Sequence, residues 1–237
     1  MSEWAPRRFW TDAAVEAVAG GHAVRLDGRP VRTPAKRELV VPTAALAEGV
    51  AAEWRAQGER IDPLTMPLTR AANAALDKAA PQEAEVVDEL AGYGASDLLC
   101  YRADAPEGLV ARQRAAWDPM LDWAEAAHGA RLATTVGVMP ALQPEAALAA
   151  LRAPVAEAGP WGLTALSEFV TLTGSLVLGL AALGRARPLE ALWAASRVDE
   201  DWQAELWGAD ADEAERVAVK REAFLQAGRF RDALSEG

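Results

Sequence analysis

Residues 23–41 read AVRLDGRPVRTPAKRELVV, and this stretch decides the fold of the N-terminal part of the chain. Three short runs, at residues 23–26, 30–33 and 38–41, are separated by turn-forming residues. The dipeptide Asp27-Gly28 is typical of a tight hairpin turn, because both residues tolerate the positive φ angles that such turns require. The stretch therefore predicts a small meander of short strands.

A sheet of three short strands needs a covering element to be stable. The residues that follow can supply one. Thr43 is a good N-cap, and Leu46, Val50 and Trp54 recur at helical spacing, so that they form one apolar stripe. Residues 1–65 are thus predicted to form a small α+β domain in which a helix covers the sheet.

From Thr69 onward the apolar pattern is helical almost throughout, with Thr69 as the expected cap of the first helix. We therefore predict the α+β fold class: a small N-terminal sheet-plus-helix domain, residues 1–65, followed by a larger, mainly α-helical domain, residues 66–237. Helices are expected at residues 69–79, 81–92, 107–127, 144–157, 189–195, 198–207 and 212–227. The long helix 107–127 has one apolar side, made of Leu109, Gln113, Trp117, Met120 and Ala124.

Residues 163–183 form the most apolar stretch, with Glu168 as its only charged residue. The length suits a membrane span, but hydroxyl side chains and two glycines interrupt the stretch. We predict the central buried helix of a bundle, because a helix that is hydrophobic all round is either core or membrane. No membrane insertion is expected.

Composition limits the function. The chain of 237 residues carries a formal net charge of −11, which disfavours nucleic acid and anionic membrane surfaces. The only cysteine, Cys100, excludes an internal disulfide, and the two histidines lack metal-ligand spacing, so no metal is expected. The N-terminus has no apolar signal segment, which favours the cytoplasm of a bacterial-type cell.

No nucleophile elbow, phosphate loop or dinucleotide fingerprint is present. We accordingly predict no catalytic residue, no cofactor and no small-molecule substrate. An alternative is an enzyme whose site is assembled from scattered residues, namely Asp77, Asp97, Tyr101 and Arg102. Such a site would need a deep polar pocket with shifted pKa values.

Residues 199–215 contain eight carboxylates and no Lys or Arg, so we expect an acidic surface without local counter-charge. Val198, Trp202 and Leu206 are predicted to form the buried stripe of the helix 198–207. Asp210 or Asp212 is expected to cap the next helix, with Glu213 or Glu215 as the acid three residues on. The remaining acids form either a solvated face or a docking surface for a basic partner.

Motifs spread over nearly the whole chain resemble a known family, the assembly chaperones of the ATP synthase F1 sector that hold its alpha subunit. Their order and spacing together carry the resemblance. The matching stretches are RFW at residues 8–10, LDGRPVRTP at 26–34, AEWRAQ at 52–57, MPLT at 66–69 with Asn73 and Asp77, DLLCYR at 97–102, Gln113 with WDP at 117–119 and Trp123, EFV at 168–170, and SRVDE at 196–200 with Gln203, Trp207 and Gly208.

The resemblance implies the same two-part fold and a function without catalysis, metal or nucleotide. It implies that the partner is the alpha subunit, held until it pairs with beta, since unpaired subunit interfaces aggregate. In the family an acid near the C-terminus is needed, and Glu213 and Glu200 are the nearest matches. The expected partner-binding residues are therefore Glu213, Glu200, Glu215 and Glu205. A general interaction module for another basic partner is the remaining alternative.

Overall fold

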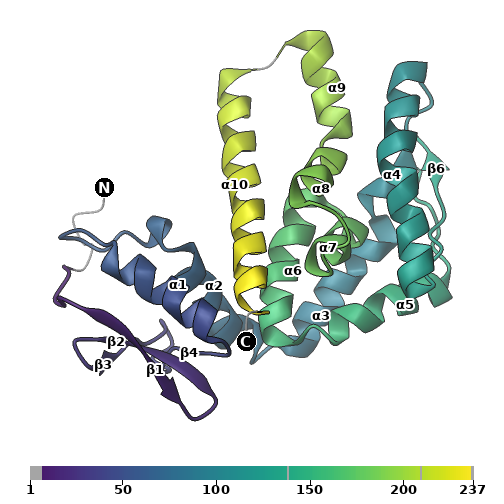
Figure 1. The fold of residues 1–237 in the computed structure, drawn as a ribbon. Coiled ribbons are helices and arrows are strands. Elements are labelled where there is room, and N and C mark those ends of the chain that lie inside the picture. Colours follow the sequence, from purple (N-terminus) through teal and green to yellow (C-terminus); the bar gives the residue numbers. More distant parts are fainter. Residues whose placement is uncertain (1–6, 138, 209, 236–237) are drawn as a thin grey trace. The chain divides into compact units, whose positions relative to one another are not determined.

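The computed structural model describes residues 7–137, 139–208 and 210–235. The chain divides into two compact units, Met1–Gln82 with Arg229–Gly237 and Glu83–Gly228, whose elements are labelled in Figure 1. The first unit carries the four-stranded sheet and the second is mainly helical, so the predicted α+β class is confirmed. The domain division after residue 65 stays a prediction, because compactness does not show which segments fold independently.

The sheet of the first unit is antiparallel and has β2 at its centre. Strands β1 (Ala13–Val18), β3 (Arg29–Pro30) and β4 (Val40–Val41) all pair with β2 (Gly21–Leu26). The strand β1 was not expected, because its sequence AAVEAV is rich in residues that favour helices. The pairing of all six residues with β2 decides its conformation.

Helix α1 (Ala44–Arg55) covers the sheet, as predicted (Figure 1). The Thr43 hydroxyl caps it by accepting the N–H of Leu46 at 3.2 Å. Leu46 and Val50 are fully buried. Trp54 is only half-buried, where its ring meets that of Trp10 edge-on with centroids 5.1 Å apart.

The start of α2 (Pro67–Ala74) corrects the predicted cap at Thr69. The helix begins two residues earlier, and Thr69 lies in its first turn. The carboxylate of Glu53, on α1, accepts the N–H groups of Leu68 and Thr69 at 2.6 and 2.8 Å. A tertiary contact therefore satisfies the donors that a local cap would otherwise have taken.

The second unit is built from helices α3 (Glu83–Gly92), α4 (Glu107–His128), α5 (Glu145–Ala156), α6 (Gly159–Thr173), α7 (Leu176–Leu183), α8 (Leu189–Ser196), α9 (Val198–Trp207) and α10 (Ala211–Ala233), together with a two-stranded parallel sheet of β5 (Tyr101–Arg102) and β6 (Thr135–Val136). All five residues predicted for the apolar side of α4 are buried. Helix α10 continues beyond the predicted end at residue 227, and its last residues belong to the first unit.

The apolar stretch 163–183 is buried as predicted, but it forms two helices rather than one. Gly174 ends α6 with a φ of 69°, a left-handed conformation that glycine adopts without strain. Ser175 then caps α7 by accepting the N–H of Leu178 at 3.0 Å. In the described residues no helix is both long enough and apolar enough to cross a membrane.

The fully buried carboxylate of Asp97 fixes this break. It accepts the N–H of Leu99 in the 3-10 turn 98–100 and the N–H of Val177 in α7, each at 3.0 Å. Ser175 and Leu176 donate to it as well. One side chain thus caps the adjoining turn and also α7, whose Val177 is 80 residues away from Asp97 in sequence.

Removing this carboxylate should destabilise the protein strongly. Each buried donor left without a partner costs about 1–3 kcal/mol, so Asp97→Ala should lower the free energy of unfolding by at least ~3 kcal/mol. Asp97→Asn keeps an acceptor oxygen and should lose less. Urea unfolding followed by circular dichroism measures both variants, and equal losses would contradict this assignment.

The same residue predicts a pH dependence. Burial raises the pKa of Asp97, although backbone N–H donors oppose the rise. A carboxyl whose pKa is higher in the folded chain contributes its stability fully below its unfolded pKa, about 4, and loses it as the pH rises through the folded pKa. The free energy of unfolding of the wild type minus that of Asp97→Asn should therefore decrease from about pH 4 toward neutrality. An increase over that range would show that the donors outweigh burial.

Candidate functional site

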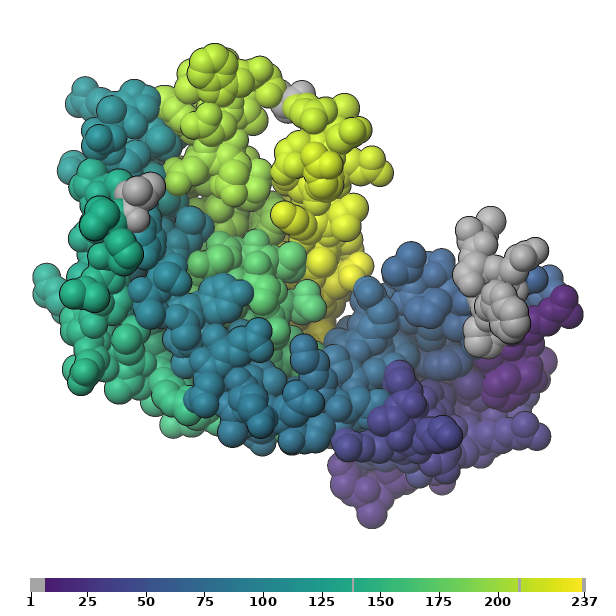
Figure 2. Space-filling model, turned by 180° about the vertical axis from the view of Figure 1, so that it is seen from behind, coloured from purple at the N-terminus to yellow at the C-terminus, as the bar shows by residue number. Residues whose placement is uncertain are grey.

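The acidic run 199–215 lies on α9 and on the start of α10. No residue of α9 is fully buried. Of the predicted stripe, Val198 and Trp202 are half-buried, but the Leu206 side chain is 57% exposed, so the prediction is wrong for Leu206. Figure 1 shows α9 and α10 side by side, joined at one end. In the space-filling view of Figure 2 a hollow separates the yellow-green atoms of α9 from the yellow atoms at the start of α10.

Helix α9 packs on α4 through Trp202 of that stripe and through polar side chains. The guanidinium of Arg112 lies over the ring of Trp202, 4.7 Å from its centroid, and donates to both carboxylate oxygens of Glu205 at 2.7 Å. The amide of Gln113 donates to Asp199 at 2.7 Å. Trp202 and these polar contacts together hold α9 on α4.

The acids also have more counter-charge than the sequence indicated. Arg197 lies 3.2 Å from Glu200 and 3.8 Å from Asp201, and Arg216 lies 2.9 Å from Glu213. Both arginines stand just outside the acidic run, so a count within the run missed them. Arg216 and Arg112, by hydrogen bonding, hold the pKa values of Glu213 and Glu205 below the usual glutamate value.

Asp210 and Glu215 differ from the other acids in their contacts. Asp210 caps α10, since its carboxylate accepts the N–H of Asp212 at 3.2 Å, and Glu213 then stands at the third helical position. Glu215 has no ion-pair partner among the described residues, and it borders a shallow cavity of about 450 Å³. The other residues around that cavity are Asp212, Arg216, Val219 and Lys220.

Exposed apolar side chains accompany these charges. The exposed fraction is 81% for Trp207 and 65% for Val219. Trp207 ends α9 and lies off the predicted stripe of that helix, which is its signal in the sequence. We call this region the α9/α10 surface; its residues are Glu200, Glu205, Leu206, Trp207, Glu213, Glu215 and Val219.

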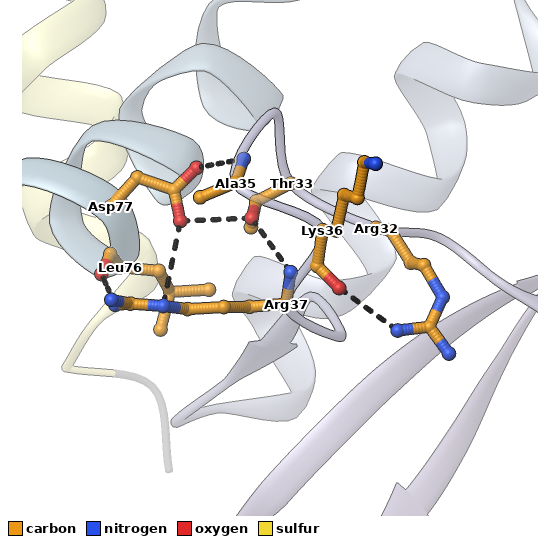
Figure 3. A network of polar contacts seen from close by, with 7 residues as sticks. All are labelled: Arg32, Thr33, Ala35, Lys36, Arg37, Leu76 and Asp77. Carbon is orange, nitrogen blue, oxygen red and sulfur yellow. Dashed lines mark hydrogen bonds and ion pairs between the residues drawn. The ribbon is translucent and has the colours of Figure 1, made fainter.

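The residues of the alternative, an assembled enzyme site, are held in structural contacts. In the first unit the carboxylate of Asp77 accepts the hydroxyl of Thr33 at 2.8 Å and the N–H of Ala35 at 2.9 Å (Figure 3). Arg37, 4.0 Å from Asp77, donates to the carbonyl of Leu76. This network fixes the loop 33–37 against the π-helical turn Ala75–Ala79 that follows α2, and it joins two of the motifs that carry the family resemblance.

In the second unit Asp97 is fully buried and caps two helical segments. Arg102 donates to the carbonyl of Leu99 at 2.9 Å and lies 2.7 Å from Asp118. Tyr101 is half-buried in β5. In the part of the chain that the structure describes, no cluster of three or more His, Cys, Asp or Glu residues is placed to hold a metal ion.

The comparisons with known proteins agree with the resemblance. The family model described as ATP12 chaperone protein matches residues 7–125. The mitochondrial protein atp12 of Schizosaccharomyces pombe is 25% identical over 228 residues, which cover 90% of this chain and 78% of the relative.

Solved structures match nearly the whole chain. Atp12 from Paracoccus denitrificans is 48% identical with a TM-score of 0.94, covering 98% of this chain and 100% of its own. An aspartate-to-lysine variant of the Paracoccus protein has the same identity and coverage and a TM-score of 0.95. Because the family model spans half of the chain and these structures span almost all of it, this chain belongs to the ATP12 chaperone family, the assembly chaperones of ATP synthase.

Proposed function

We propose that this protein binds the unassembled alpha subunit of the ATP synthase F1 sector and prevents its aggregation until alpha pairs with beta. The proposal includes no catalysis, cofactor or nucleotide. We place the activity in the cytoplasm, in keeping with the single cysteine, which is free and buried. The membership of the ATP12 family supports an assembly partner, and the alpha subunit is the partner that the sequence resemblance implies.

One observation carries the proposal: Trp207 is 81% exposed at the end of a helix that buries none of its residues. Tryptophan is the residue type that most often dominates binding energy at protein interfaces. The carboxylates around it are solvent-exposed, so they can exchange their own arginines for those of a partner at little cost. An apolar anchor with an acidic rim suits a subunit surface that is apolar and basic.

Beta can replace such a holder by competition, and no energy source is needed. The chaperone would cover apolar area on alpha that otherwise aggregates. Mixing purified alpha subunit with this protein and following light scattering tests the activity directly. Suppression of aggregation by the protein, reversed on adding beta subunit, is the expected result. Unchanged aggregation at a molar excess of the protein would exclude the function.

Charge reversal on the α9/α10 surface should weaken binding without unfolding the protein. Glu200→Lys and Glu213→Lys should each raise the Kd for alpha at least about tenfold at low salt, because lost attraction becomes repulsion. Salt should reduce the difference, since exposed charges are screened. Fluorescence anisotropy with labelled alpha subunit measures both effects.

Each of these acids stands in the first turn of a helix, where lysine itself costs about 0.3–1 kcal/mol of fold stability. Glu213→Gln, which removes the charge without reversing it, separates this local effect from binding. Glu157→Lys, an exposed acid at the C-terminal end of α5, is the matched control and should bind as the wild type does. If Glu157→Lys weakened binding as much as the two test variants, only the net charge would matter.

Truncation of the aromatic anchor provides an independent test. Trp207→Ala should raise the Kd at least about tenfold, as expected for a hot-spot aromatic. Its melting temperature should stay close to that of the wild type, because the ring contributes little to the core. Leu142→Ala removes a side chain that is 93% exposed elsewhere on the same unit and should leave the Kd unchanged. A Trp207→Ala variant with wild-type affinity would place the contact outside the α9/α10 surface.

A further inference from the structure

A second surface of the helical unit has a different chemistry. An open cavity of about 560 Å³ lies between α4 and α8 and is lined by Arg112, Ala115, Ala116, Pro119, Met120, Arg187, Ala191, Leu192, Ala194, Ala195 and Val198. We call it the α4/α8 groove. Every lining residue except the two arginines is apolar.

The shape of the groove suits a helix better than a small polar molecule. Met120, Leu192 and Ala195 are buried and form its floor, whereas Ala115, Ala191 and Ala194 at its edges are exposed. Alanine side chains are short, so that the backbone of a second helix can approach closely. Amphipathic helices bind grooves of this kind by laying their apolar face on the floor.

Charge indicates what that helix carries. Although the chain has a net charge of −11, the charged residues that line the groove are both arginines. Arg112 is neutralised by Glu205, which holds it with two hydrogen bonds. Arg187, in the loop between α7 and α8, is exposed and has no ion-pair partner among the described residues. The groove therefore presents one uncompensated positive charge beside an apolar floor.

We propose that the α4/α8 groove receives an amphipathic helix of the alpha subunit, with its apolar face on the alanines and a carboxylate paired with Arg187. This inference rests on the proposed function and adds a second contact to it. The two surfaces carry opposite charges. The α9/α10 surface is acidic, and the groove carries the positive charge of Arg187. Together the two surfaces fix the orientation of the bound alpha subunit. In the reversed orientation like charges would face each other and repel.

The only native thiol allows the groove to be labelled selectively. Burial raises the pKa of Cys100 to about 12, so this thiol is unreactive at neutral pH. A new cysteine in Ala194→Cys, at the edge of the groove, can carry an environment-sensitive fluorophore. Adding purified alpha subunit should shift its emission to the blue, with a midpoint equal to the Kd measured by anisotropy. The same label in Ala126→Cys, an exposed position of α4 that does not line the groove, should not respond.

The charge contact is tested on the full chain by substitution of Arg187. Arg187→Glu should raise the Kd for alpha at least about tenfold, whereas Arg187→Lys should stay within about threefold of the wild type. Arg114→Glu, an exposed position of α4 outside the groove, is the matched control and should not change the Kd. Because all of these positions are exposed, melting temperatures should be unchanged.

The outcomes separate this inference from the function on which it rests. If the wild type binds alpha while the Ala194→Cys label is silent and Arg187→Glu binds normally, the groove proposal is overturned and the proposed function stands. If the wild type does not bind alpha at all, both are overturned. A blue shift that grows with the concentration of the chaperone alone would show that a second copy fills the groove, and this also overturns the proposal.

Discussion

The helical unit depends on one buried carboxylate, that of Asp97. It accepts backbone N–H groups from the adjoining turn and from α7, 80 residues away in sequence, and thereby sets where α7 begins. Gly174 ends α6, and Asp97 accepts an N–H group in the first turn of α7. Splitting it into α6 and α7 folds the chain back on itself and buries both helices in one core. The donors that Asp97 satisfies offset part of the cost of burying it.

A second set of polar contacts determines how α9 packs on α4. Arg112 and Gln113 on α4 bind Glu205 and Asp199, and so select the face on which α9 packs. As a consequence, Leu206 and Trp207 are left in solvent beside the remaining acids. The α9/α10 surface and the α4/α8 groove share Arg112, which borders the groove while it holds an acid of the surface. A partner that binds both the α9/α10 surface and the α4/α8 groove therefore contacts opposite charges on adjoining parts of one unit.

Much of the candidate site could be read from the sequence, but not its arrangement. The acids at residues 199–215 are visible as a run, and the family resemblance directed attention to Glu200 and Glu213. Their partners Arg197, Arg216 and Arg112 lie outside the run, so their pairing depends on helix geometry and on contact with α4. The exposure of Leu206 could not be predicted, because apolar spacing placed it on one stripe with Val198 and Trp202. The α4/α8 groove has no sequence signal, since alanine is frequent throughout the chain.

The sequence was sufficient to predict a structural feature where neighbouring residues alone determine it. The cap at Thr43, the turn at Asp27-Gly28 and the apolar side of α4 follow from neighbouring residues, and each was predicted. Tertiary structure decided the cases in which a distant group satisfies the backbone. Strand β1 is extended because β2 pairs with it. Helix α2 begins at Pro67 because Glu53 accepts the N–H groups of its first turn. Helix α7 begins where Asp97 accepts an N–H group of its first turn. Buried donors must find an acceptor wherever it lies, and the sequence does not record which residues come together in space.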